Sequence, residues 1–319
     1  MQGLHFSSAL DAFGGTGCVS YMLKCHDKIV TYNDYLRFNH LIGLALIENR
    51  ATRLSDSDIQ FVLRRDQSDQ YGDFIAFKFS GIYFTDEENA WLDTVAQNIA
   101  RLQDDYKRAI AYYALFQACI IKRPYNLFHR KNLYMRTSEV ERGFGNKATW
   151  DTPFEEHFCK FVTEANAAVF DSRLPCKAVC HDALEVPGSF DLVYIDTPYL
   201  NRNGIGVNYF DFYHFLEGII DYESWPKRIN EKRKHFPLKG RRSAWSDPTQ
   251  TYHAFEKLFE RYADSILVVS YRSDGIPAEE DLVRLMHRVK PNVQRLHYGE
   301  YKYVLSTNGD SRELLLIGS

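Results

Sequence analysis

The chain has 319 residues, of which 45% are hydrophobic and 25% are charged, so it is neither an intrinsically disordered chain nor a long coiled coil. This length fits one large domain or two closely associated ones. No apolar run approaches the roughly 18 residues of a membrane span, and residues 1–10 lack the basic start and apolar core of a secretory signal. We therefore expect a cytoplasmic protein without a membrane partner.

The six cysteines are scattered, and none of them forms a C-x-x-C pair. Cys176 and Cys180 are the closest pair, and His181 beside them raises the alternative of a zinc site. A structural zinc site needs further ligands, and no second ligand pair stands at a suitable spacing. Reduced, buried thiols are the better interpretation, and we expect no metal site.

The net charge is only −3, but the charges are unevenly spread along the chain. Residues 122–136 hold five basic and no acidic residues, and residues 227–242 hold eight basic residues and one acidic residue. The two segments together carry +12, which leaves −15 on the rest of the chain. This segregation favours a surface that binds polyanions, although two solvated surface segments would explain the charge equally well.

The N-terminal elements predict the opening of a doubly wound sheet. An apolar run over 9–13 leads into the glycine turn 14–17, which predicts a strand followed by a helix over 18–24. A β-branched run over 28–32 predicts a second strand, and 36–47 has the apolar spacing of a helix. A strand, a glycine turn, a helix and a strand in this order are typical of doubly wound folds.

The periodicity then changes to that of helices. Residues 85–88 form a capping box, and two helices are expected over 86–121. A second capping box at 152–155, with proline at the first helical position, predicts a helix that runs to about Phe170. We therefore expect a mostly helical insertion over 51–170.

The sheet pattern resumes after the insertion, so the sheet-forming part consists of residues 1–50 and 171–319. Its later elements are expected as strands at 177–180, 190–195 and 265–271, helices at 211–222, 249–262 and 277–289, and closing strands at 292–298 and 313–317. The closing strands are joined by a long connection that favours antiparallel pairing. The sequence thus predicts an α/β fold with a doubly wound, mostly parallel sheet, an antiparallel C-terminal edge and a helical insertion domain.

The glycine turn lies in the first of two motifs that carry chemistry. Glycines after a strand let a ligand approach the backbone closely. A dinucleotide fingerprint would need a third glycine at position 20, which is Ser20, so a pyrophosphate site is disfavoured and a nucleoside remains allowed. Asp34 ends the second strand, where a carboxylate can bind both ribose hydroxyls. Structural turn glycines alone remain an alternative.

The second motif comprises Asp196, Thr197, Pro198 and Tyr199, directly after the buried strand over 190–195. The carboxyl ends of strands hold the ligand sites of open α/β sheets. A carboxylate, a main-chain carbonyl and a ring can together hold a flat, amino-bearing ring by two hydrogen bonds and stacking. An ordinary turn would explain this motif in isolation, but the glycine turn upstream favours a binding site.

The two motifs resemble the signature of N6-adenine-specific DNA methyltransferases, in the order of the DNA adenine methylase group. That order is a cofactor motif, a helical recognition insertion and a catalytic motif, and the resemblance spans nearly the whole chain. It implies S-adenosylmethionine as cofactor and double-stranded DNA as partner. The matching cofactor positions are Asp11, Phe13, Gly15, Gly17, the ribose-binding Asp34, and Asp182 against the cofactor's adenine.

The resemblance also implies a mechanism in which the target adenine is flipped out of the duplex. Asp196 and the carbonyl of Thr197 would accept hydrogen bonds from its amino group, and Tyr199 would stack on the ring. Transfer is then direct, and positioning carries the catalysis. The family motif usually has proline where this chain has Thr197, a change that keeps the carbonyl and adds an N–H.

The basic and aromatic residues over 122–136 and 144–147 look like the family's DNA-contacting segment, and 270–275 looks like the strand and turn that line the target pocket. The segment 227–242 is expected to add phosphate contacts. The predicted DNA-binding residues are Lys122, Arg123, Arg130, Lys131, Arg136, Asn146 and Lys147.

Three functions remain open at this stage. The first is a site-specific DNA adenine-N6 methyltransferase of a restriction-modification or related system, with a partner endonuclease. The second acts on RNA adenine or on cytosine, although Asp196 in place of serine disfavours cytosine. The third is a catalytically silent DNA-binding relative: only ten residues precede Asp11, where the family usually has a covering segment, so we expect weak cofactor binding. A nicotinamide dehydrogenase is the weakest option, given Ser20.

Overall fold

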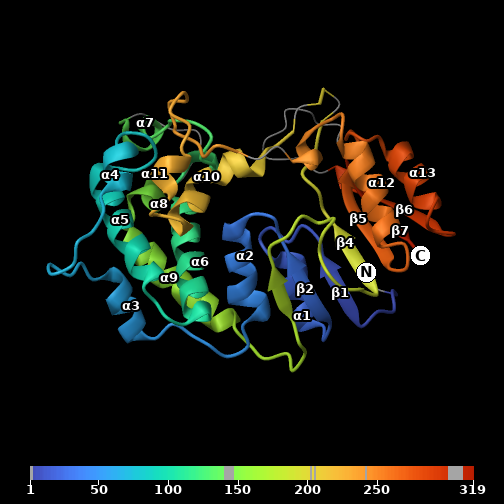
Figure 1. Cartoon of the computed structure of the whole chain (residues 1–319), viewed down its shortest axis with the longest axis horizontal. Helices are drawn as coiled ribbons and strands as arrows, with labels where there is room; N and C mark the ends of the chain where they lie inside the picture. Colours follow the sequence, from blue (N-terminus) through green and yellow to red (C-terminus); the bar gives the residue numbers. More distant parts are fainter. Residues whose placement is uncertain (1–2, 140–146, 202, 205, 241–242, 301–311) are drawn as a thin grey trace. The chain divides into compact units, whose positions relative to one another are not determined.

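The structure is a computed structural model that describes residues 3–139, 147–201, 203–204, 206–240, 243–300 and 312–319. The chain divides into two compact units, each built from separated segments. The sheet unit consists of Met1–Tyr35, Ser172–Tyr209 and Arg241–Ser319, and the helical unit consists of Leu36–Asp171 and Phe210–Gly240. Figure 1 labels the helices and strands of both units.

The strands form one sheet in the order β3-β2-β1-β4-β5-β7-β6. Their bounds are β1 (Ser8–Asp11), β2 (Ile29–Asn33), β3 (Lys177–Val179), β4 (Leu192–Ile195), β5 (Ile266–Arg272), β6 (Val293–Glu300) and β7 (Arg312–Gly318). Strands β1 to β5 pair in parallel, whereas β7 pairs antiparallel with β5 and β6. The predicted α/β fold with a mostly parallel sheet and an antiparallel C-terminal edge is confirmed.

Strands β1 and β4 are neighbours in the sheet although they lie far apart in the sequence. From β1 the sheet continues through β2 to β3, and from β4 it continues in the opposite direction to β5. Ligand sites of doubly wound sheets lie at the carboxyl ends of strands at such a switch point. Asp11 ends β1 and Asp196 follows β4, so both motifs meet there.

In the described part of the chain, the sheet unit carries the helices α1 (Cys18–Cys25), α12 (Thr251–Arg261) and α13 (Glu279–His287). Helices α12 and α13 lie together beside β5, β6 and β7 (Figure 1). Val269 and Tyr271 of β5 join Phe255 of α12 in one apolar core. Because side chains alternate along a strand, Ser270 faces the opposite side of the sheet.

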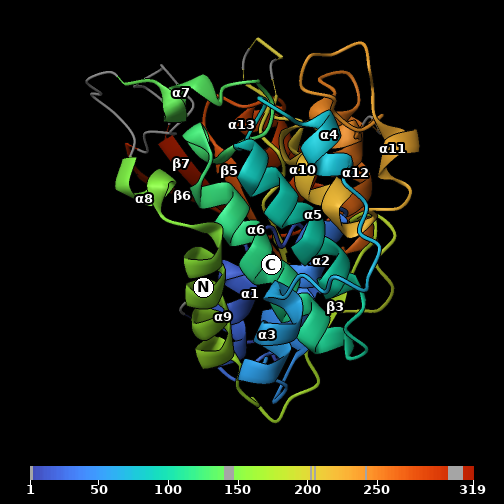
Figure 2. The ribbon, with the colours of Figure 1, turned by 90° about the vertical axis from the view of Figure 1, so that its left-hand side faces the viewer.

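The helical unit is built from short and long helices, which Figure 2 shows from the side. They are α2 (Arg37–Gly43) with a π-helical turn at Leu44–Glu48, α3 (Asp56–Leu63), α4 (Phe74–Lys78), α5 (Asp86–Ala100), α6 (Asp105–Ile121), α7 (Tyr134–Thr137), α8 (Lys147–Asp151), α9 (Phe154–Ala168), α10 (Tyr209–Ile220) and α11 (Trp225–Arg228). Helix α6 packs between α5 and α9. No helix of the described residues is both long and apolar enough to cross a membrane.

The helical unit is larger than the insertion expected over 51–170. It begins at Leu36, because α2 packs against α6. It also includes 210–240, because Phe215 of α10 packs its ring against Phe79 with 5.1 Å between centroids. Recognition of DNA by this unit stays a prediction.

One of the two predicted capping boxes forms. Thr85 accepts the N–H of Glu88, whose carboxylate accepts the N–H of Thr85, so α5 begins as predicted. The box predicted at Thr152 is wrong, because its hydroxyl donates to the carbonyl of Ala148 in the preceding helix. Pro153 occupies the cap position of α9 and has no side chain that can accept a hydrogen bond.

Candidate active site

The glycine turn after β1 packs closely against β2. Gly17 has a φ of 80° and caps α1, and its N–H donates to the Gly14 carbonyl at 2.8 Å. A Cβ at Gly14 would lie 2.1 Å from the ring of Tyr32, whose hydroxyl donates to the Gly15 carbonyl at 2.7 Å. Only glycine fits at position 14, which lets the turn pack closely against β2.

Asp34 lies beside this turn. It follows β2 directly and accepts the N–H of Gly15 at 2.9 Å. The preceding Asn33 donates to the carbonyls of Ala12 at 3.0 Å and His181 at 3.3 Å. This one amide therefore links the carboxyl ends of β1, β2 and β3.

The other predicted cofactor residues lie at the same edge of the sheet. Phe13 packs edge-on against Trp245, with 5.0 Å between ring centroids. Asp182 follows β3, is exposed, and accepts the N–H of Leu184 at 3.0 Å. The structure thus brings the whole predicted cofactor set to the carboxyl ends of β1, β2 and β3, and their contacts with a cofactor stay a prediction.

Asp11 is the most buried acid of the set, with 1% of its surface exposed. The Ser20 hydroxyl donates to its Oδ2 at 2.7 Å, while Oδ1 has no hydrogen-bond partner among the described residues. Burial raises the pKa of Asp11 to about 7; the Ser20 hydrogen bond opposes the rise, and the charges of Asp196 and Asp34 add to it. An unsatisfied, buried carboxylate oxygen is suited to a cationic or N–H ligand.

The second motif lies one strand away, at the end of β4. The Tyr199 hydroxyl donates to Asp196, and the Tyr199 ring packs edge-on against Tyr271 with 5.8 Å between centroids. Burial raises the pKa of Asp196 to about 6, the hydrogen bond from Tyr199 lowers it, and the charge of Glu313 raises it. Asp196 is therefore mostly ionised at neutral pH and offers a strong acceptor at the edge of the sheet.

Thr197 and Pro198 complete the motif. Thr197 is 3% exposed, and its hydroxyl has no hydrogen-bond partner among the described residues. The next residue after the motif, Leu200, accepts the N–H of Ile276 at 3.0 Å. This bond joins the motif to the turn that follows 270–275, the segment expected to line the target pocket.

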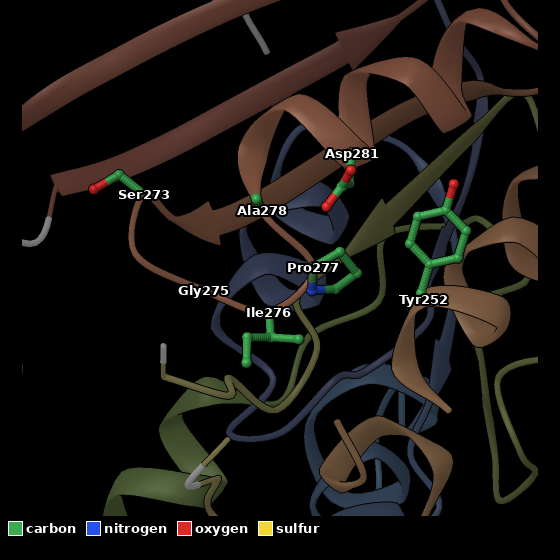
Figure 3. A pocket seen from close by; sticks show the side chains of 7 residues that line it. All are labelled: Tyr252, Ser273, Gly275, Ile276, Pro277, Ala278 and Asp281. Carbon is green, nitrogen blue, oxygen red and sulfur yellow. The ribbon is translucent and has the colours of Figure 1, made fainter. Parts of the chain in front are cut away.

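A pocket opens at this turn, where β5 leads into α13 (Figure 3). Ser273 and Gly275 line it together with Tyr252 of α12 and Asp281 of α13. Its walls therefore combine small residues with an aromatic ring and a carboxylate. The predicted lining segment reaches the surface here, next to the residues that follow the catalytic motif.

The basic residues predicted to contact DNA fall into two groups. Lys122, Arg123 and Arg136 are buried in the helical unit, with 1%, 1% and 5% exposure. Glu88 binds Lys122 at 2.9 Å and Arg136 at 2.7 Å, and Arg123 donates to main-chain carbonyls, including that of Tyr83. Charges held in this way are not presented to DNA. The prediction that Lys122, Arg123 and Arg136 contact DNA is therefore wrong, because their side chains are buried.

Arg130 and Lys131 form the second group and are exposed. Two exposed rings flank them in the sequence, Tyr125 with 53% and Tyr134 with 65% exposure. Tyr125 adopts a positive φ of 62°, an uncommon conformation for a bulky residue. Cations and rings thus share one exposed stretch of the helical unit, a combination suited to nucleic acid.

The remaining predicted contacts are partly described. Lys147 is exposed and pairs with Asp151 at 2.9 Å, whereas Asn146 lies outside the described residues. Residues 241–242 of the second basic segment also lie outside them. The exposed cations of that segment are Lys227, Lys232, Arg233, Lys234 and Lys239.

The cysteines of the zinc alternative contact the backbone. Cys176 Sγ lies 3.6 Å from the Lys28 carbonyl, and Cys180 Sγ lies 3.8 Å from the Tyr35 carbonyl. Across the described ranges, no group of three or more His, Cys, Asp or Glu residues is arranged to hold a metal.

Two residues around the site were not identified as site residues from the sequence. In the sequence Ser20 stands out only as the position where a dinucleotide fingerprint would have glycine. In the structure its hydroxyl, in the helix after the turn, is the hydrogen-bond donor to Asp11. Glu313 gave no signal, because its approach to Asp196 depends on the antiparallel return of β7 beside β5.

Comparisons with known proteins place this site in a family. The model of the D12 class N6 adenine-specific DNA methyltransferases matches residues 5–273. The chain is similar to the type II methyltransferase M2.HphI of Haemophilus parahaemolyticus, with 29% identity over 87% of this chain and 80% of that protein.

Two longer relatives are the modification methylases LlaI of Lactococcus lactis subsp. lactis, at 24% identity, and StsI of Streptococcus sanguinis, at 23% identity. Those matches cover 98% and 96% of this chain but only 49% and 47% of the relatives, so the chain spans about half their length. Because the family model matches most of the chain, the chain belongs to the D12 class of N6-adenine-specific DNA methyltransferases.

Proposed function

We propose that this DNA adenine-N6 methyltransferase binds S-adenosylmethionine at its glycine turn and methylates an adenine that is flipped out of double-stranded DNA. The observation that carries the proposal is the meeting of two different acids at the switch point of the sheet. Asp11 is buried with one unsatisfied oxygen, and Asp196 stands at the end of the adjacent strand beside an aromatic ring. The first suits a charged ligand and the second an amino-bearing ring.

The residues at β1, β2 and β3 fit the cofactor. The bare backbone at Gly15 allows close approach of the nucleoside, and Asp34 can accept ribose hydroxyls besides the Gly15 N–H, since a carboxylate offers about four lone pairs. Oδ1 of Asp11 can accept a hydrogen bond from the cofactor's ammonium group. Asp182, exposed after β3, would contact the adenine ring. When bound, the cofactor supplies an electrophilic methyl group.

The residues after β4 fit the acceptor base. The Asp196 carboxylate and the Thr197 carbonyl would accept the two N–H bonds of the amino group and turn its lone pair away from the ring, and Tyr199 would stack on the base. Asp196 would stabilise the positive charge that develops on the nitrogen as it accepts the methyl group, until the nitrogen releases one of its protons to solvent. Flipping is required because a stacked adenine cannot reach this edge.

In this proposal the helical unit, which includes residues 227–240 of the second basic segment, supplies the DNA surface. Arg130, Lys131 and Lys147 neutralise phosphates, and the exposed cations over 227–239 add further contacts. The ring of Tyr125, which is 53% exposed, would stack on bases. The relatives are named type II methyltransferases and modification methylases, which supports a restriction-modification role with a partner endonuclease.

The test is transfer of a labelled methyl group to duplex DNA, with N6-methyladenine identified after digestion to nucleosides. We expect transfer by the wild-type chain, and Asp196→Ala should abolish it because the acceptor for the amino group is lost. The control is Asp27→Asn, an exposed residue of the same unit, which should transfer at the wild-type rate. A near wild-type rate for Asp196→Ala would refute the role assigned to Asp196. Methylated cytosine or methylated RNA as the product would show that the substrate is a different one.

A further inference from the structure

A carboxylate outside both motifs lies close to the catalytic motif. Glu313 stands on β7 and accepts a hydrogen bond from the Ser270 hydroxyl at 2.6 Å. Ser270 is 8% exposed, and Glu313 is half-buried. A buried hydroxyl that donates to a carboxylate forms a strong, charge-assisted hydrogen bond, so its proton is fixed in direction.

The register of the sheet explains why these residues meet. Strand β5 lies between β4 and β7. The parallel register pairs Ile195, the last residue of β4, with Val269, so Asp196 comes next to the level of Ser270. The antiparallel register with β7 pairs Arg272 with Glu313, so Glu313 lies diagonally opposite Ser270 on the same face of the sheet. Asp196, Ser270 and Glu313 therefore form a row across three strands.

The hydroxyl of Tyr199 belongs to this row. It donates to Asp196 and lies within hydrogen-bonding reach of Ser270, as does the hydroxyl of Tyr194 on β4. Burial raises the pKa of Tyr199, and the charge of Asp196 and the hydrogen bond to Asp196 raise it further. Tyr199 therefore keeps its proton, and that proton has two acceptors within reach: Asp196 and the Ser270 oxygen.

The choice between the two acceptors matters for the reaction. A phenol that donates to Asp196 occupies a lone pair and withdraws electron density from the carboxylate that must bind the amino group. Ser270 can accept the Tyr199 proton only while its own proton points elsewhere, because a hydroxyl has a single proton to donate. Glu313 fixes that proton away from Tyr199.

We propose that Glu313, acting through Ser270, is a positioning residue that holds the Tyr199 hydroxyl while the target amino group is bound to Asp196. The inference rests on the proposed role of Asp196. In the empty site Tyr199 donates to Asp196; when the base enters, the phenol donates to Ser270, and Asp196 is left with its full capacity as an acceptor. Without Glu313, Ser270 can donate to Tyr199 and so direct the phenol back to Asp196.

The test measures single-turnover methyl transfer and the KM for DNA in four single variants, one double variant and one control variant. Ser270→Ala removes the alternative acceptor for the Tyr199 proton. Glu313→Met removes the carboxylate that fixes the Ser270 proton, whereas Glu313→Gln keeps an oxygen that can accept a hydrogen bond from Ser270. Tyr199→Phe removes the hydroxyl and is combined with Glu313→Met. Glu260→Gln changes an exposed acid of the same unit and serves as the control.

We expect Ser270→Ala and Glu313→Met each to lower the transfer rate about tenfold, the effect of losing one hydrogen bond, with the KM for DNA unchanged within about twofold. Glu313→Gln should retain most of the rate. Adding Glu313→Met to Tyr199→Phe should have no further effect, because the hydroxyl that Glu313 positions is already gone. A loss of the same size in the Tyr199→Phe background would overturn the proposal, as would a normal rate for Glu313→Met.

A second measurement separates this inference from the proposed function. The coupling between Ser270→Ala and Glu313→Met, whose side chains are hydrogen-bonded in the DNA-free protein, is measured in urea unfolding, which needs no catalysis. If the wild-type chain forms no N6-methyladenine, the proposed function fails, and the absence of coupling in unfolding would then refute the hydrogen-bond row by itself. If Asp196→Ala is inactive while Glu313→Met is normal, only the positioning role fails.

Discussion

Replacing Asp11 by asparagine should abolish a loss of stability that the cofactor-free protein undergoes as the pH rises towards 7, while it weakens cofactor binding. Burial raises the pKa of Asp11 from 3.8 to about 7. Between these values the folded chain holds a proton that the unfolded chain has released, so this group's stabilisation is present below about pH 4 and is lost as the pH rises to about 7. Asparagine carries no such proton, and its contribution does not change with pH.

The size of the effect follows from the same pKa. Each pH unit between the two pKa values changes the free energy of unfolding by about 1.4 kcal/mol. The wild-type protein should therefore lose about 3 kcal/mol of unfolding free energy relative to Asp11→Asn between pH 5 and pH 8. The asparagine amide places an N–H where Oδ1 now has no partner among the described residues, which costs about 1–3 kcal/mol at every pH. The change with pH, and not the absolute difference, is therefore the quantity to compare.

Urea unfolding followed by circular dichroism at both pH values measures this change, with Asp27→Asn as the exposed control in the same unit. Isothermal calorimetry at pH 8 should show S-adenosylmethionine binding at least about tenfold weaker to Asp11→Asn, because a charge-assisted hydrogen bond is lost. If wild-type and Asp11→Asn change equally in stability between pH 5 and pH 8, the account of Asp11 as a buried acid with a raised pKa is refuted.

Three further results are expected. At saturating cofactor, the single-turnover rate should fall about tenfold for each pH unit below 6. Burial raises the pKa of Asp196 to about 6, and only the ionised carboxylate is a full acceptor. A single-turnover rate that does not change with pH would contradict this. Glu88→Gln should lower the free energy of unfolding by about 3–5 kcal/mol, because two buried cations lose their carboxylate. The control Glu87→Gln, at an exposed position, should change the free energy of unfolding by less than about 0.5 kcal/mol, and equal effects of the two substitutions would count against the ion pairs. Replacing Arg130 and Lys131 together by alanine should reduce the slope of log affinity for DNA against log salt by up to about 1.8, and an unchanged slope would show that this stretch is merely solvated.

The sheet was predictable because its strands are short apolar runs that end in recognisable turns. The β-branched run before Asn33 and the buried run before Asp196 each form the expected strand. The antiparallel edge was predictable from the long connection before the last strand. The short helices α3, α4, α7, α8 and α11 were not identified individually, because helices of four to eight residues show too few turns to establish a period.

Charge was the least reliable guide to position. The basic residues over 122–136 look alike in the sequence, yet Lys122 and Arg136 are buried, whereas Arg130 and Lys131 are exposed. The difference comes from Glu88, which lies more than thirty residues upstream and meets the two buried cations only after α5 and α6 have packed. An ion pair between distant segments leaves no local pattern, so only the structure separates the two groups.

The division of the helical unit into two segments affects how the protein is made and how it can be re-engineered. Phe79 and Tyr83 come from the first segment, and Phe215 and Trp225, which pack against them or against each other, come from the second. During synthesis the first segment must therefore wait, with part of its aromatic core uncovered, until the ribosome has passed residue 240. For the same reason, an exchange of recognition specificity with a relative must transplant both segments together, because a graft of 36–171 alone would leave those rings against foreign side chains.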